Sequence, residues 1–204
     1  SNRPVLRTEG TGAARRVVFG SPVAALGAML SASYHKSGAF ARIVGPQGAL
    51  KAAGSYELPS GRDAGNLVPT ETFYSIRAQS RLAELGIIGL GSGRNSDAII
   101  LSSMPTARRG DDLVPLSAQV LTGRVVRFAR WVLAQLPPGA EEPEVKLLFE
   151  QAAAVFLFPT AQEAARLEAQ VVTQGEQRSV VLSVSARADL AGIPFHLGFG
   201  LPLK

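Results

Sequence analysis

The sequence predicts an α/β fold, in the broad sense that includes α+β, in which helices flank a mixed β-sheet. One stretch, residues 117–136, has a sustained helical period. Elsewhere apolar and polar residues alternate, first over 167–171 and again over 180–184, with Gly175 between the two runs. A period of about 3.6 residues favours a helix and a period of two favours a half-buried strand, so both element types are expected.

The length of the chain and its first residues suggest the domain organisation. A chain of 204 residues can bury one sizeable core or two small ones, and one domain with appendages is the safer interpretation. Residues 1–20 place threonines and glycines between basic residues and predict an irregular N-terminal arm, ordered only if something holds it. We therefore expect residues 21–204 to form one domain.

A helix is predicted to begin at Ser21 and Pro22 and to end at Gly38. Serine is a favoured N-cap, proline suits the first helical position, and glycine suits the position after the last turn. After this helix, residues 40–44 predict a strand, whereas residues 50–66 show no period and predict a surface loop. The side of the helix expected to face the core carries Val23, Leu26, Leu30 and Tyr34.

Residues 68–86 pair an extended Pro-Thr-Glu entry with a short charged helix. Either Thr70 or Thr72 can cap this helix, and Gly86 can supply the left-handed residue that ends it. Two apolar runs, residues 87–90 and 98–101, follow on either side of a loop rich in Gly, Asn, Ser and Asp. The two runs predict a β-hairpin.

The helix of residues 117–136 has an apolar face and an opposite face with an unusual composition. The opposite face gathers Arg124, Arg127 and Trp131. A second layer of the same chain can cover this tryptophan. Alternatively, the arginines and Trp131 form a patch between subunits, because Trp and Arg dominate the energetics of interfaces. The residues expected to face the core are Leu121, Val125, Phe128, Val132 and Leu136.

The C-terminal third predicts one more long helix and three strands. The segment Pro137-Pro138-Gly139 ends the preceding helix, and glutamates at 141, 142 and 144 place negative charge at the start of the next. Residues 146–158 are so apolar that we expect them to be buried on most sides. Residues 160–163 fit a capping box, and residues 193–201 predict the last strand.

Composition favours a protein that is buried in an assembly. Hydrophobic residues make up 46% of the chain and charged residues only 18%, which leaves little charge to cover a free monomer. There is no cysteine, so disulfides and thiolate chemistry are excluded. No run approaches the ~20 apolar residues of a membrane span and no signal peptide opens the chain, so we expect a cytoplasmic location without a membrane span.

Arginine dominates the basic residues, since only four of the 21 basic residues are lysine. Arginine suits partly desolvated protein contacts and also phosphate. Basic runs interleaved with aromatic residues are absent from the sequence, so we expect no nucleic-acid partner. An Arg-rich nucleic-acid-binding module remains the alternative function.

Chemistry-bearing motifs are sparse, and we expect no catalytic residue, no cofactor and no metal. The two histidines, His35 and His196, have no cysteines to complete a zinc site. The glycines at 89, 91 and 93 lead into a strand, and neither a dinucleotide fingerprint nor a P-loop fits them. The acidic pair Asp111-Asp112 reads as a solvated loop beside Arg108-Arg109. A small enzyme that uses Glu71 is a further rival hypothesis.

The order of these segments resembles the large subunit of the type VI secretion contractile sheath, the TssC or VipB family. The Pro-Thr-Glu entry, charged helix and hairpin match first, and Arg127-Phe128-Ala129-Arg130-Trp131 resembles the family's Arg-Phe-Ala-His-Tyr-type signature. The helix from Ser21, the strand at 41–45 and the closing Pro194-Phe195-His196-Leu197 are also similar. The match starts near Phe19, and the family's N-terminal third, to which a Clp-type ATPase binds in some members, is not matched.

The resemblance implies a structural role and a set of partners. Large sheath subunits pair with a small TssB-like subunit and stack into a helical tube around an inner tube protein. Terminal strands complete sheets between neighbours, so the strands at 180–187 and 193–202 are expected to be shared. The chain is then expected to self-associate into a helical or ring homo-oligomer, and its candidate contact residues are Arg124, Arg127, Arg130, Trp131, Phe195, His196 and Phe199.

Overall fold

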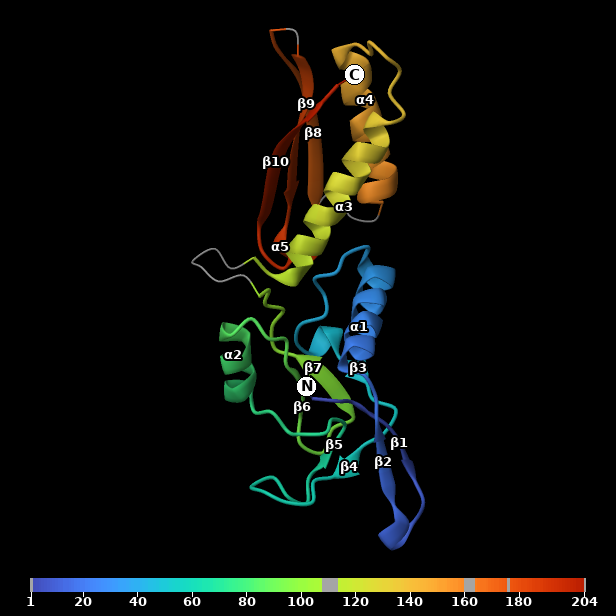
Figure 1. Cartoon of the computed structure of the whole chain (residues 1–204), viewed down its shortest axis with the longest axis vertical. Helices are drawn as coiled ribbons and strands as arrows, with labels where there is room; N and C mark the ends of the chain where they lie inside the picture. The colour runs from blue at the N-terminus through green and yellow to red at the C-terminus, as the bar shows by residue number, and fades with distance from the viewer. Residues whose placement is uncertain (1, 108–113, 160–163, 176, 204) are drawn as a thin grey trace. The chain divides into compact units, whose positions relative to one another are not determined.

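A computed structural model describes residues 2–107, 114–159, 164–175 and 177–203. Helices and strands are both well represented, as the predicted α/β class requires, and the strands are distributed over several small sheets (Figure 1). The chain divides into two compact units. Unit 1 comprises residues 1–34 and 42–116, and unit 2 comprises residues 35–41 and 117–204. A single domain over 21–204 stays a prediction.

Unit 1 begins with a β-hairpin where the sequence predicted an irregular arm. The strands β1 and β2 pair antiparallel, and Val5 is buried at the start of β1. The prediction failed because the hairpin is held by residues far along the chain, as described below. The elements of unit 1 are β1 (Val5–Glu9), β2 (Arg16–Phe19), α1 (Pro22–Ser37, whose last turn belongs to unit 2), β3 (Leu50–Lys51), β4 (Tyr56–Glu57), β5 (Leu67–Val68), α2 (Ile76–Glu84), β6 (Leu90–Ser92) and β7 (Ala98–Leu101).

Helix α1 has the predicted start and the predicted glycine at its end, and two of the four residues expected to face the core, Leu26 and Leu30, are half-buried and pack against it. Gly38 has a φ of 66°, in the left-handed region that favours glycine. Val23, expected in the core, is 75% exposed, and Tyr34 is also exposed. The buried residues of α1 are Ala25, Met29 and Ser33.

The core of unit 1 forms between α1 and the sheet of order β3-β7-β6. Its members are Ala25, Met29, Ile43, Leu90, Ile99, Leu101 and Met104. The predicted hairpin of residues 87–101 is therefore confirmed as β6 and β7, which pair antiparallel. The strand predicted over 40–44 is wrong, because only Val44 makes an isolated bridge there, parallel to Leu101.

The segment 50–66, expected to be a loop, contributes two short strands. Leu50 pairs with Ile99, and Tyr56 pairs with Val68. These strands have two residues each, which is too short for any period to be visible in the sequence.

Helix α2 is capped by Ser75 rather than by Thr70 or Thr72. The Ser75 hydroxyl accepts a hydrogen bond from the Ala78 amide at 3.3 Å. The helix ends before Gly86, whose φ of 75° confirms the predicted left-handed residue. A Cβ atom at Gly86 would lie 2.8 Å from the Thr106 carbonyl oxygen, so both conformation and space require glycine here.

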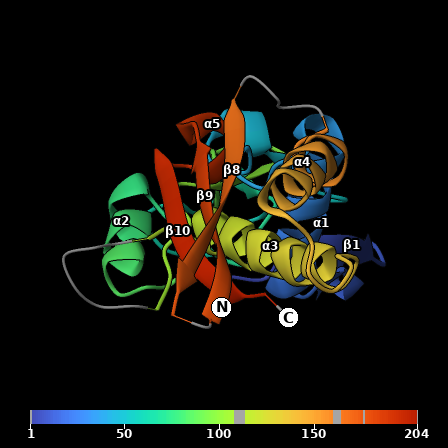
Figure 2. The same ribbon diagram turned by 90° about the horizontal axis from the view of Figure 1, so that it is seen from above.

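Unit 2 packs two helices against an antiparallel sheet of order β10-β9-β8. Figure 2 shows the helices α3 and α4 on the same side of this sheet. The long helix and its predicted core residues Leu121, Val125, Phe128 and Val132 are confirmed as buried, although Leu136 lies beyond the helix and is half-buried. The elements are α3 (Leu116–Leu133), α4 (Glu142–Ala152), the π-helical turn η3 (Ala153–Leu157), β8 (Ala165–Gln174), β9 (Gln177–Ala186), α5 (Ala188–Ala191) and β10 (Phe195–Pro202).

The sequence predicted negative charge at the start of α4 and a capping box at 160–163. Glu141 and Glu144 form a reciprocal capping box at the helix start, consistent with the acidic cluster there. The second capping box, predicted at 160–163, lies outside the described residues, as do Arg108-Arg109 and Asp111-Asp112.

The three C-terminal strands are confirmed, and Gly175 turns the chain with a φ of 61°. None of the helices within the described ranges has the length and hydropathy needed to cross a bilayer.

Replacing Gly86 tests the C-terminal end of α2. We expect Gly86→Ala to lower the free energy of unfolding by about 1–2 kcal/mol. The left-handed conformation is unfavourable for alanine, and its Cβ atom would also clash with the Thr106 carbonyl oxygen. The control is Gly27→Ala in α1, where a Cβ atom meets nothing within 4 Å. This control should raise stability by about 0.5–1 kcal/mol. Urea denaturation measures the stability of both variants. An unchanged stability of G86A would contradict the conclusion that conformation and space require glycine at this position.

Candidate functional site

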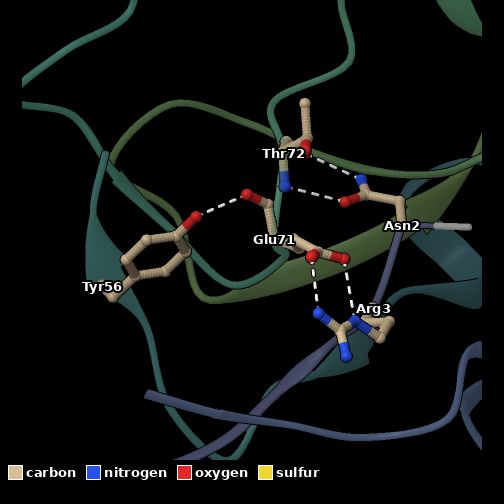
Figure 3. A network of polar contacts seen from close by, with 5 residues as sticks. All are labelled: Asn2, Arg3, Tyr56, Glu71 and Thr72. Carbon is tan, nitrogen blue, oxygen red and sulfur yellow. Dashed lines mark hydrogen bonds and ion pairs between the residues drawn. The ribbon is translucent and has the colours of Figure 1, made fainter. Parts of the chain in front are cut away.

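The Pro-Thr-Glu segment of unit 1 holds the N-terminal residues of the chain (Figure 3). The Asn2 side chain is buried, with 5% of the residue exposed. Its amide nitrogen donates to the carbonyl oxygens of Thr72 at 2.7 Å and Leu90 at 2.8 Å, and its oxygen accepts from the Thr72 amide at 2.8 Å. One side chain therefore bonds to three backbone groups, of which the Thr72 carbonyl also accepts from the Thr70 hydroxyl.

A bidentate ion pair lies beside this asparagine. The Arg3 guanidinium donates to the two carboxylate oxygens of Glu71 at 2.9 and 2.6 Å. These hydrogen bonds lower the pKa of Glu71 below its ordinary value, and the attraction of the Arg3 charge adds to the effect. The Tyr56 hydroxyl donates to the backbone carbonyl of Glu71, and burial together with the nearby carboxylate raises the pKa of Tyr56.

Backbone pairing completes the attachment of the N-terminal segment. The Val5 amide donates to the Pro69 carbonyl at 2.8 Å, and the Glu71 amide donates to the Arg3 carbonyl at 2.8 Å. Thr70 was one of the two predicted helix caps. It is fully buried and donates its hydroxyl to the Thr72 carbonyl at 3.0 Å. These contacts account for Glu71 as a structural anchor, and a carboxylate with a lowered pKa is a poor general base.

The arginines predicted as contact residues on α3 have different surroundings. Arg124 donates to the carbonyl oxygens of Gly38 at 3.2 Å and Leu157 at 3.3 Å, and its guanidinium lies 5.8 Å from the centre of the Phe40 ring. Arg124 therefore ties three segments of unit 2 together. Arg127 and Arg130 are exposed, and neither forms an ion pair within the described residues.

Trp131 lies on the surface in an aromatic cluster. It is 48% exposed. Its ring makes an edge-on contact with Phe156 at 5.3 Å between centroids and a tilted contact with Phe128 at 6.4 Å. Phe128 in turn is buried and contacts Phe149 edge-on. The tryptophan predicted on the non-core side of the helix is thus seated on the core and open on its outer side.

An apolar groove runs beside this tryptophan between α3 and α4. Its volume is about 240 Å³. No charged side chain belongs to its lining, which is formed by Trp131, Val132, Gln135, Leu148, Gln151, Ala152, Val155 and Phe156. We call this surface the hairpin face.

Sequence reasoning missed the α4 side of the hairpin face. Residues 146–158 were expected to be buried on most sides, yet Leu147, Val155 and Phe156 are each more than half exposed. Val155 and Phe156 lie in the π-helical turn η3, where the wider helix changes the direction of each side chain. The available signal was the seven-residue apolar run 152–158, which is too broad for one buried helix face.

The predicted contact residues of the last strand also differ in exposure. Phe195 is buried and belongs to the core of unit 2. Phe199 is half-buried, and His196 is exposed. The side chains of β10 alternate between the buried side and the open side of the sheet, so only His196 of the three lies on the outer surface.

The pairing register shows which backbone groups of β10 are free. The Leu203 amide donates to the backbone carbonyl of Arg178 in β9, and the register between the two strands runs without a shift. Because backbone direction alternates along a strand, the odd-numbered residues of β10 bond to β9. Its even-numbered residues direct their amide and carbonyl groups to the outer edge: His196, Gly198 and Gly200. No strand pairs with this edge in the described ranges.

The described residues define a mixed α/β protein whose distinctive surfaces are an apolar helical face and an open strand edge. No protein-family model matches the sequence, and no significant match is found among curated proteins.

The buried asparagine gives a test of the N-terminal attachment. We expect Asn2→Ala to lower the free energy of unfolding by about 1–3 kcal/mol, because the Thr72 amide and the Leu90 carbonyl lose their side-chain partner in a buried place, while the Thr72 carbonyl keeps the Thr70 hydroxyl. Urea denaturation measures the loss, and hydrogen exchange should show faster exchange at Val5 and Thr72. Unchanged exchange at these two amides would contradict the role given to Asn2.

The ion pair of Arg3 and Glu71 predicts a pH dependence. The folded pKa of Glu71 lies below its unfolded value, so its stabilising contribution is complete above the unfolded pKa and is lost as pH falls through the folded pKa. We expect the stability difference between the wild type and Glu71→Gln to shrink towards acid pH. Denaturation at a series of pH values measures it. A difference that grows on acidification is the opposite sign and would refute the pairing.

Proposed function

We propose that the chain is a structural subunit of a contractile sheath of the type VI secretion kind. In this role it has no catalytic activity, and it assembles with further copies and with a smaller TssB-like subunit around an inner tube protein. The finer fold assignment, a sheath-subunit-like domain of the TssC family, is part of the same proposal. Its basis in the sequence is the order of segments from Phe19 to the closing strand.

The observation that carries the proposal is the open edge of β10. Among the residues that the structure describes, the eight-residue strand β10 is paired on one side only, and such a strand presents a row of free amide and carbonyl groups. Soluble proteins usually protect such edges with charge, and β10 has no lysine, arginine or carboxylate along its length. Addition of a strand from a neighbouring subunit would satisfy these groups.

The second edge of the sheet supports a role in assembly less directly. The Arg187 amide donates to the Ala164 carbonyl, and the register between β8 and β9 is unshifted. The odd-numbered residues of β8 therefore direct their backbone groups away from β9. The strand β8 carries an Arg166–Glu168 ion pair on its exposed side and packs against α4. We therefore place strand addition at β10.

A proline at His196 tests the use of this edge. His196→Pro removes an amide that faces outward and leaves the β9 ladder intact, because His196 does not bond to β9. We expect negative-stain electron microscopy to show tubes or rings for the wild type co-expressed with a small sheath subunit, and none for H196P.

The matched control is His196→Ala, which removes the same side chain but keeps the amide. We expect H196A to assemble like the wild type. Circular dichroism and thermal denaturation check that H196P is folded. Assembly by H196P, or a wild type that stays monomeric with every candidate small subunit, would contradict the proposal. Salt-sensitive binding of the monomer to duplex DNA would favour the nucleic-acid alternative instead.

A further inference from the structure

We infer that the hairpin face is a dimer interface at which a second copy of this chain docks, forming a four-helix bundle from two α3–α4 hairpins. This inference concerns a helical surface of unit 2 that includes no residue of β10. It does not depend on the proposed sheath function. The occupant is identified by the composition of the face, by its charges and by its symmetry.

The hairpin face has the composition of an interface centre. Trp131, Val155 and Phe156 are about half exposed or more, and they surround a groove without charged lining. Large apolar residues that are exposed together, with an aromatic pair among them, are typical of the residues that contribute most to binding. The aromatic rings are already ordered by contacts with one another, so docking would immobilise little additional side chain.

The charges at the two ends of the face are opposite. Arg127 lies one turn before Trp131 on α3, and it has no ion-pair partner in the described part of the chain. Glu144 lies one turn before Leu148 on α4, at the end of the hairpin where the two helices are connected. Because α3 and α4 run in opposite directions (Figure 1), Arg127 and Glu144 mark opposite ends of the groove.

Opposite charges at the two ends make the face self-complementary. A twofold axis across the middle of the groove places Arg127 of each copy beside Glu144 of the other copy, and it covers the Trp131–Phe156 pair of each copy with the Gln135–Leu148 end of the other. An isologous contact needs this property, since the same patch must fit itself. Antiparallel hairpins that pack in this way give the usual geometry of a four-helix bundle.

The single tryptophan of the chain reports on this contact directly. Trp131 is the only tryptophan, and it lines the groove. We expect sedimentation equilibrium to show a monomer–dimer equilibrium, and the emission of Trp131 to shift to shorter wavelength as the concentration of the full chain increases. A wild type that is monomeric at all concentrations overturns the inference, whatever the emission wavelength of Trp131.

Alanine variants locate the interface. Trp131→Ala and Phe156→Ala should weaken the dimer by about tenfold or more, as expected for interface hot spots. The control is Ile76→Ala, which shortens an exposed apolar side chain on α2 in unit 1 and should leave the dimer unchanged. Circular dichroism verifies that each variant is folded. A dimer that resists both W131A and F156A is formed elsewhere and overturns the inference.

A charge exchange distinguishes a second copy from any other occupant. Arg127→Glu alone and Glu144→Lys alone each place like charges together at both ends of the dimer, so each should be weaker than the wild type by about tenfold. An equimolar mixture of R127E and E144K restores opposite charges at both ends, and it should recover the affinity of the wild type as a heterodimer. No recovery on mixing, with both variants folded, overturns the twofold arrangement.

Discussion

Strand β9 satisfies its backbone groups on both sides, and the rest of unit 2 is organised around this pairing. Its even-numbered residues bond to β10 and its odd-numbered residues bond to β8, as the two unshifted registers require. The buried side chains Val180, Leu182 and Val184 then all lie on one face of the sheet. The helices α3 and α4 cover that face (Figure 2), which leaves the outer face and the edge of β10 for other contacts.

The elements that were predicted correctly are those in which a local period is long enough to be read. Helix α3 and the strands β8 and β9 extend over 18, 10 and 10 residues, and most of the residues that each period indicates are buried. The strands β3, β4 and β5 have two residues each and exist because distant segments pair with them. The hairpin of β1 and β2 was missed for the same reason, since its anchor is the segment 69–72.

The candidate surfaces were predictable to a similar extent. The position of Trp131 on the non-core side of α3 followed from the helical period alone. The role of Arg124 did not, because its carbonyl partners at Gly38 and Leu157 come from segments that are remote in the sequence. Phe156 was missed because a π-helical turn redirects it, and no period in the sequence indicates such a turn.

The last residue of β10 limits what its edge can accept. Pro202 falls on the even-numbered, outward-facing side of the strand and has no amide hydrogen to offer. A guest segment that extends along His196, Gly198 and Gly200 would therefore lose its donor at Pro202. Strand pairing would stop at this residue. The length and register of the added strand would therefore be limited by the missing amide hydrogen of Pro202 and not by side-chain recognition.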